Sequence, residues 1–111
     1  MLVVTRFVVE PGDEETFRGQ AAAALGALSE RPGWLGGRLG RAVDDARGWL
    51  ILTEWESVGA YRRALGGFDV KMHATPLLAR AVAEPSAYET FDDLSARSDR
   101  AADADTAGPA R

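Results

Sequence analysis

The sequence predicts an α+β fold with a four-stranded antiparallel sheet and the element order β-α-β-β-α-β of ferredoxin-like domains. Two observations carry this prediction. Apolar, β-branched runs at residues 2–10 and 48–57 are typical of strands, and an amphipathic helical repeat lies between them. That repeat begins after Asp13 and closes at Pro32–Gly33. The chain of 111 residues fits one domain.

Each element has its own boundary signals. Pro11–Gly12 ends the first strand, Ser57 can cap a short helix, and Pro76 stops the next one. In chain order we expect strand 2–10, helix 13–31, a glycine-interrupted strand 33–45, strand 48–57, helix 58–65, a short helix 70–74 after Asp69, one or two further turns at 76–82, and strand 86–93.

The domain is expected to span residues 1–93 and to be followed by a disordered tail at 94–111. The tail has only Leu94 as a larger apolar residue, so it cannot offset the entropy lost on ordering. Within the domain both alternations of the strands are apolar, yet two helices cover only one face of a sheet. We therefore expect a homodimer in which the uncovered faces pack together as a dimeric α+β barrel.

Composition excludes several classes of function. A net charge of −4 argues against a nucleic-acid partner. No apolar run is long enough for a membrane span and no secretory leader is evident, so we expect a cytoplasmic protein. One histidine and no cysteine cannot supply a conventional transition-metal site, and we expect no bound metal.

Two stretches, RPGWLGGRLGR at 31–41 and TEWESVGAYRRALGGFDVKMHA at 53–74, resemble the antibiotic biosynthesis monooxygenase family, and the likeness extends over about residues 2–92. The resemblance implies a cofactor-independent monooxygenase that combines molecular oxygen with an electron-rich aromatic, quinol or polyketide-like substrate. Two alternatives stay open: an isomerase or cyclase that works through an enolate, and a dimer that only binds a ligand such as haem.

His73 is the first candidate catalytic residue. On a helix that starts near Asp69, Val70, His73 and Leu77 share one stripe if helical geometry continues, which predicts an inward-facing, neutral imidazole. Such a group can act as a general base towards a phenolic or carbon-bound proton. The alternative is a core histidine that donates to a carbonyl freed before Pro76.

Arg6 is the second candidate catalytic residue, because it is a cation within an apolar strand. It shares an alternation with Leu2 and Val4, where a guanidinium must be paired or border a cavity. There it could stabilise the enolate or phenolate formed on deprotonation. The alternative is a structural ion pair with Glu54 or Glu56 on the neighbouring strand.

Three aromatic residues are candidates for the wall of a substrate cavity: Trp55, Tyr61 and Tyr88. Trp55 could instead anchor its strand to the helix, and Tyr61 could donate to a backbone carbonyl rather than to substrate.

A comparison with haem-degrading relatives bears on the cofactor. In them the helix histidine is paired with a pocket asparagine and with a tryptophan nine residues before it. His73 matches, but Arg6 and Ala64 stand at the other two positions, so the resemblance does not favour haem breakdown. The chain contains no asparagine, which also removes a polar group that anthrone oxygenases of the family use. We expect no bound cofactor.

Overall fold

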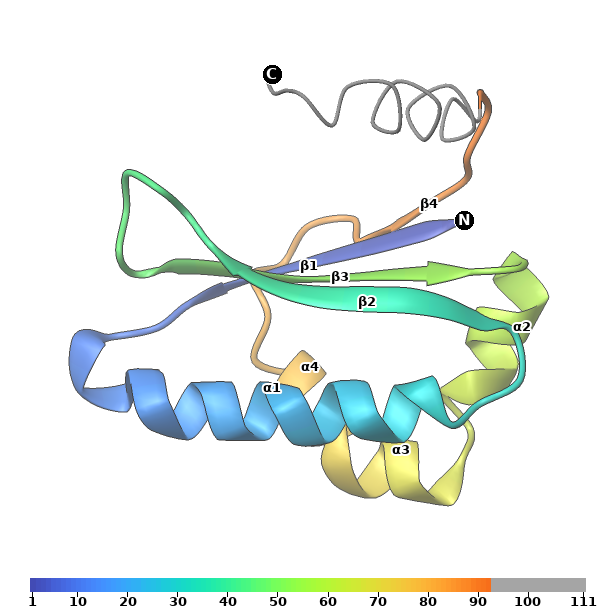
Figure 1. Ribbon diagram of the computed structural model, residues 1–111, viewed down its shortest axis with the longest axis horizontal. Helices are drawn as coiled ribbons and strands as arrows, with labels where there is room; N and C mark the ends of the chain where they lie inside the picture. Colours follow the sequence, from blue (N-terminus) through green and yellow to red (C-terminus); the bar gives the residue numbers. More distant parts are fainter. Residues whose placement is uncertain (93–111) are drawn as a thin grey trace, which may run out of the picture.

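The computed structural model describes residues 1–92, and the expected tail at 94–111 lies outside the described residues. Its elements are β1 (Leu2–Val8), a short 3-10 turn η1 (Pro11–Asp13), α1 (Glu14–Ser29), β2 (Trp34–Arg41), β3 (Gly48–Trp55), α2 (Val58–Ala64), α3 (Phe68–His73), α4 (Thr75–Leu78) and β4 (Ala87–Tyr88). The sheet order is β2-β3-β1-β4, and all neighbouring strands are antiparallel. The predicted ferredoxin-like α+β fold is confirmed, with all helices on one side of the sheet (Figure 1).

Strand alternation divides the sheet into two faces. In the register of β1 and β3, Thr5 lies opposite Ile51, and both are buried against the helices. The next pair along, Arg6 and Leu50, points to the uncovered face, which we call the open face. Its apolar members in β1 and β3 are Leu2, Val4, Val8, Leu50 and Leu52.

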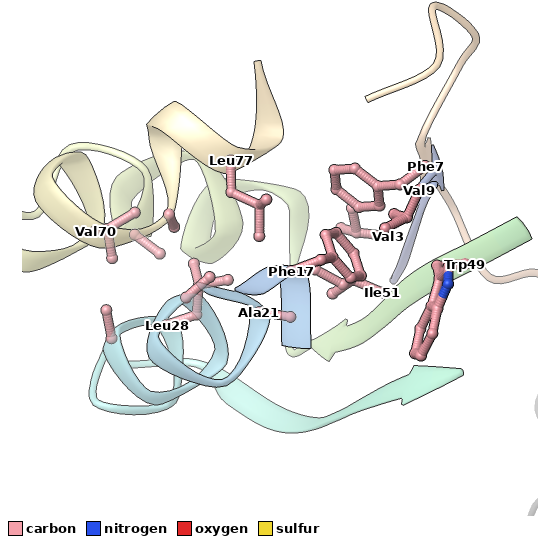
Figure 2. Packing of buried hydrophobic residues seen from close by; sticks show 14 of the residues in the cluster. Val3, Phe7, Val9, Phe17, Ala21, Leu28, Trp49, Ile51, Val70 and Leu77 are labelled. Atoms are coloured by element: carbon pink, nitrogen blue, oxygen red, sulfur yellow. The ribbon is translucent and has the colours of Figure 1, made fainter. Parts of the chain in front are cut away.

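The core lies between the sheet and α1, with α3 and α4 closing one side (Figure 2). Phe17 of α1 lies at its centre, with ring centroids 5.1 Å from Phe7 and 5.5 Å from Trp49. Such aromatic contacts add to the stabilisation from burial alone. Within residues 1–92, no helix is both long and apolar enough to cross a membrane.

The last strand is much shorter than predicted. β4 pairs with β1 only at Ala87 and Tyr88, whereas the sequence predicted a strand over 86–93. Residues 82–86, which we call the edge segment, touch β1 through two separate main-chain bonds: Val4 N–H donates to Ser86 O (2.7 Å) and Val82 N–H donates to Arg6 O (2.8 Å). Between these two bonds the edge segment forms no main-chain hydrogen bond with β1, and Pro85 has no N–H to offer.

The turn between α1 and β2 depends on Gly33, which has a φ of +92°. A Cβ at this position would also collide with the Cβ of Ala60. We expect Gly33→Ala to lower the free energy of unfolding by about 1–3 kcal/mol. Gly26→Ala is the matched control, because it lies in α1 with open space around it and should stabilise the helix by roughly 0.5–1 kcal/mol. Urea unfolding at 25 °C measures both, and an unchanged Gly33→Ala variant would contradict the strained turn.

Candidate functional site

His73 does not face the core, so the predicted inward orientation is wrong. It is the last residue of α3 and is exposed. The buried residues in this region are Val70 of α3, Ala74 at the junction and Leu77 of α4. The helix does not continue through the junction, because Ala74 has a φ of −109° and α4 starts anew at Thr75. The residues that face the core are spaced four and three positions apart, at Val70, Ala74 and Leu77, and His73 lies outside this stripe. His73 lies over surface depressions between α1 and α3.

Arg6 has a partner other than the two that the sequence suggested. Its Nη1 lies 2.8 Å from Oε2 of Glu84 in the edge segment, and this contact raises the pKa of Arg6. An ion pair with Glu54 is not formed, since the register places Leu2 opposite Glu54 and Leu50 opposite Arg6. Arg6 belongs to the open face and His73 to the outer side of the helical layer, so the two predicted catalytic residues do not share a site.

Trp55 is fully buried under α2. Its indole N–H donates to Oγ1 of Thr53 at 2.9 Å. The ring packs edge-on against Trp34, with centroids 5.4 Å apart, and is tilted against Tyr61 at 5.7 Å. Trp55 lines neither of the two cavities described below, and its placement fits the anchoring interpretation.

A first cavity, which we call the inner chamber, opens between the edge of β1 and the edge segment. Its volume is about 260 Å³. Its walls include Val4, Thr5 and Arg6 of β1, Tyr61 of α2, Leu78 of α4 and Glu84 of the edge segment. The chamber therefore joins the helix-covered side of the sheet to the open face. It also brings together two of the predicted site residues, Arg6 and Tyr61.

A second cavity, which we call the outer groove, lies between α2, α3 and α4. Its volume is about 650 Å³, and it is lined by Tyr61, Leu65, Lys71, Thr75, Leu78 and Ala79. Tyr61 and Leu78 belong to both cavities, so these two side chains form the wall between them. The volume of the outer groove alone lies within the range that is typical of small-molecule sites, roughly 300–1,000 Å³.

Tyr61 presents an unused polar group at this wall. Its hydroxyl forms no hydrogen bond with any of residues 1–92, so the alternative of a backbone carbonyl as partner is not observed. Burial raises the pKa of Tyr61 above its ordinary value. The phenol therefore keeps its proton at neutral pH and can donate a hydrogen bond to a ligand.

Tyr88 lies outside both cavities. It is paired with Leu2 on the open face, 45% exposed, and its hydroxyl donates to Pro85 O at 3.0 Å. This bond holds the edge segment in place, and nothing in its position supports contact with a ligand in the chamber.

The chamber also offers groups that the sequence analysis missed. Glu84 is one of these groups. In the sequence only its position directly before Pro85 sets it apart from the other acidic residues. The other two belong to the main chain. In an antiparallel strand the N–H and C=O of one residue point to the same side. The bonds of Val4 N–H and Arg6 O to the edge segment therefore also direct Val4 O and Arg6 N–H towards it, where the described residues provide no partner.

Residues 1–92 hold no group of three or more histidine, cysteine, aspartate or glutamate side chains that could bind a metal ion. Neither cavity is lined by a histidine. The inner chamber is lined by the polar side chains of Thr5, Arg6, Tyr61, Glu84 and Ser86.

The chain is thus a small α+β protein with one cavity at the sheet edge and a neighbouring groove between its short helices. Residues 1–72 match the family described as "Antibiotic biosynthesis monooxygenase". The chain belongs to the antibiotic biosynthesis monooxygenase family.

Solved structures agree with this assignment. A mutant of SnoaB, a cofactor-independent oxygenase from Streptomyces nogalater, is 27% identical with a TM-score of 0.71, over 84% of this chain and 94% of the SnoaB chain. A second SnoaB structure is 25% identical with a TM-score of 0.63 over the same shares of the two chains. A conserved protein from Methanosarcina mazei Go1, at 16% identity and a TM-score of 0.67 over 81% of this chain and 91% of its own, shares the fold. None of the curated proteins compared with the chain matched it.

Proposed function

We propose that the protein is a cofactor-independent monooxygenase for an electron-rich aromatic, quinol or polyketide-like substrate whose reacting ring lies in the inner chamber. The observation that carries the proposal is the similarity to SnoaB, which extends over nearly the whole SnoaB chain. The chamber adds chemical support, because it combines a free phenol, an unpaired main-chain N–H and a carboxylate next to a guanidinium. A location in the cytoplasm stays a prediction.

The reaction begins with removal of a proton from the substrate ring. Glu84 is the carboxylate that lines the chamber and is the candidate acceptor of this proton. The substrate oxygen that then carries negative charge receives hydrogen bonds from the hydroxyl of Tyr61 and the N–H of Arg6. Donors placed where charge develops stabilise the transition state. The guanidinium of Arg6, beside Glu84, contributes positive charge to the same end of the chamber.

The carbanion then combines with dioxygen and a proton to give a hydroperoxide. Loss of water converts this hydroperoxide into a ring carbonyl, so one oxygen atom enters the product and the other leaves as water. The substrate itself supplies the electrons that reduce dioxygen. Proton transfer and charge stabilisation each contribute factors of about 10²–10⁴ in enzymes, which suits a substrate that already oxidises slowly in air.

Oxygen uptake with a panel of anthrones and hydroquinones tests this function. We expect at least one substrate to be consumed with one dioxygen per molecule, well above its rate of spontaneous oxidation. An isomerase or cyclase would convert substrate without oxygen uptake, so the same assay separates it from a monooxygenase. Uptake no faster than the blank with every substrate would reject the proposal.

Removal of the Tyr61 hydroxyl tests the site. We expect Tyr61→Phe to lower kcat/KM by about tenfold to a hundredfold, less than the loss from an enclosed oxyanion hole because the chamber opens to solvent. The free energy of unfolding should hardly change, since this hydroxyl has no partner within the described residues. Tyr88→Phe and His73→Ala are the controls, and both should keep full activity. A loss of turnover in a stably folded His73→Ala variant would restore the general-base interpretation of His73.

We further propose that the open face packs against the open face of a second copy. Leu2, Val4, Leu50 and Leu52 lie there without a covering helix (Figure 1). Val8 is 64% exposed on the same face, and a mostly apolar depression of about 330 Å³ lies beside it. An apolar surface of this extent is typical of an interface rather than of a solvated monomer.

A further inference from the structure

Three of the oxidisable aromatic side chains lie in ring-to-ring contact, and we call them the ring series. Trp55 is the middle member, with ring centroids 5.4 Å from Trp34 and 5.7 Å from Tyr61. The chain has one further tryptophan, Trp49, and one further tyrosine, Tyr88. Within residues 1–92 neither of these two contacts a ring of the series. The ring series is therefore a separate path rather than part of a general aromatic core.

The ring series runs from the inner chamber to the surface. At one end Tyr61 lines the chamber, where its hydroxyl has no hydrogen-bond partner within the described residues. In the middle Trp55 is fully buried. At the other end Trp34, the first residue of β2, is partly exposed and lines neither the chamber nor the outer groove. A molecule at the surface is thus connected with the chamber through two ring contacts.

The contact between the two indoles is built into the sheet. Trp34 and Trp55 lie directly opposite each other in the register of β2 and β3, so their side chains share a face. The ring of Trp34 occupies space that is open because position 37 is glycine, since a Cβ on Gly37 would collide with it. The indole N–H of Trp55 donates to Oγ1 of Thr53 at 2.9 Å, which fixes the second ring. Strand pairing and these two local contacts therefore set the spacing of the rings.

Indole and phenol rings can carry single electrons. Both give up one electron to strong oxygen-centred radicals, whereas phenylalanine does not, and rings in contact exchange electrons rapidly. The proposed reaction supplies such radicals as a side product. A substrate anion that gives one electron to dioxygen becomes a radical and leaves superoxide, and this radical binds a second dioxygen to form a peroxyl radical. Tyr61, at the chamber wall, is the oxidisable ring that this radical meets first.

We propose that Trp34, Trp55 and Tyr61 form an electron relay through which a soluble thiolate at the surface quenches a substrate peroxyl radical in the inner chamber. The proposal rests on the proposed function for the source of the radical. The peroxyl radical takes the hydrogen atom of the Tyr61 hydroxyl and becomes a hydroperoxide. An electron from Trp55 and a proton from water in the chamber restore the phenol. Trp34 then reduces Trp55, and the thiolate reduces Trp34. In sum, a peroxyl radical, a thiolate and a proton give a hydroperoxide and a thiyl radical.

Pulse radiolysis of the full chain with azide radicals tests the relay without a substrate. Azide radicals oxidise accessible indoles, and of the three tryptophans only Trp34 is not buried. The Tyr88→Phe background leaves Tyr61 as the one tyrosine. We expect the tryptophanyl absorption to decay and the tyrosyl absorption to rise with the same rate constant, independent of protein concentration. Transfer runs in this direction because the tyrosyl radical is the more stable of the two at neutral pH.

Substitutions in the same background assign the signal to the ring series. Tyr61→Phe should abolish the tyrosyl absorption. Trp55→Phe, which keeps a ring in the core, should abolish the concentration-independent rise, and so should Trp34→Phe at the partly exposed end. Trp49→Phe is the matched control, because it removes a buried tryptophan of the same strand outside the series, and it should leave the rate unchanged. Circular dichroism checks that each variant is folded.

The quenching role has its own readout. Peroxyl radicals from a water-soluble azo initiator are supplied together with glutathione, and the oxidised fraction of Tyr61 is measured by mass spectrometry. Trp55→Phe should raise this fraction severalfold, whereas Trp49→Phe should not. Without glutathione the wild type and Trp55→Phe should differ little, because the relay then has no source of electrons.

The relay is overturned if the tyrosyl absorption rises only in proportion to protein concentration, if Trp55→Phe and Trp34→Phe leave its rate unchanged, or if Trp49→Phe abolishes it. Equal oxidation of Tyr61 in the wild type and Trp55→Phe with glutathione present would reject the quenching role. Oxygen uptake by a protein without intramolecular electron transfer would reject the relay alone. Electron transfer along the ring series, without oxygen uptake on any substrate, would support the relay path and reject the monooxygenase.

Discussion

Trp55→Ala is expected to lower the free energy of unfolding by about 3–5 kcal/mol, the usual cost of removing a buried tryptophan. Trp55 is fully buried, and its ring contacts that of Trp34 in β2 and that of Tyr61 in α2. Its loss would leave a cavity at the junction of β2, β3 and α2. Urea unfolding followed by circular dichroism measures the effect, with an unchanged denaturant slope if the variant still unfolds in two states.

Trp55→Phe is the matched control. It keeps an aromatic ring but removes the indole N–H that donates to Thr53, so a smaller loss of stability is expected. Because Trp55 lines neither cavity, this variant should also keep the wild-type KM. A stable Trp55→Phe protein with a KM raised severalfold would instead make Trp55 a wall of the substrate cavity. A cost below about 1 kcal/mol for Trp55→Ala would contradict its anchoring role.

Leu52→Lys is expected to convert the proposed homodimer into a monomer. Leu52 lies in the middle of the open face, opposite Val4 on one side and Arg38 on the other. In the dimer each copy would bury one new ammonium beside existing positive charge. Each such burial costs several kcal/mol, so the dissociation constant should rise by at least about a hundredfold. Sedimentation equilibrium over a range of protein concentrations measures it.

Met72→Lys is the control for this change. Met72 is 56% exposed on α3, on the side of the helices away from the sheet, and the substitution should leave the assembly unchanged. Because Leu52 is only half-buried within one chain, the variant monomer should still fold. A wild-type protein that sediments as a monomer at all concentrations would reject the open-face interface, and so would a Leu52→Lys variant that stays dimeric.

The elements with strong local signals were predictable from the sequence. Ser57 caps α2, because its Oγ accepts a hydrogen bond from Ala60 N–H at 3.0 Å. A serine directly before a helical pattern had indicated this cap. Strands β1 and β3 and helix α1 followed in the same way from periodicity. The length of β4 was not predictable, because it depends on where the distant edge segment leaves β1.

The orientation of Tyr61 was predictable from the sequence, whereas the orientation of His73 and the partner of Arg6 were not. Tyr61 was expected at the wall of a cavity, and in α2 it lines the inner chamber. His73 lies within α3 at three residues from Val70, a spacing that left its side open, and the core contact falls on Ala74 instead. Arg6 pairs with a glutamate 78 positions away, in a segment without regular structure, so strand neighbours were the wrong place to look.

The weak attachment of the edge segment has a consequence for how ligands reach the chamber. Two main-chain hydrogen bonds and one exposed ion pair hold residues 82–86 to β1, whereas β1 and β3 are paired along their whole length. Segments with few buried contacts open locally at a small fraction of the free energy of global unfolding. The edge segment thus both lines the inner chamber and forms the most weakly attached part of this sheet edge. For the proposed function we expect a bulky ring to enter by a brief local opening that leaves the packed core undisturbed.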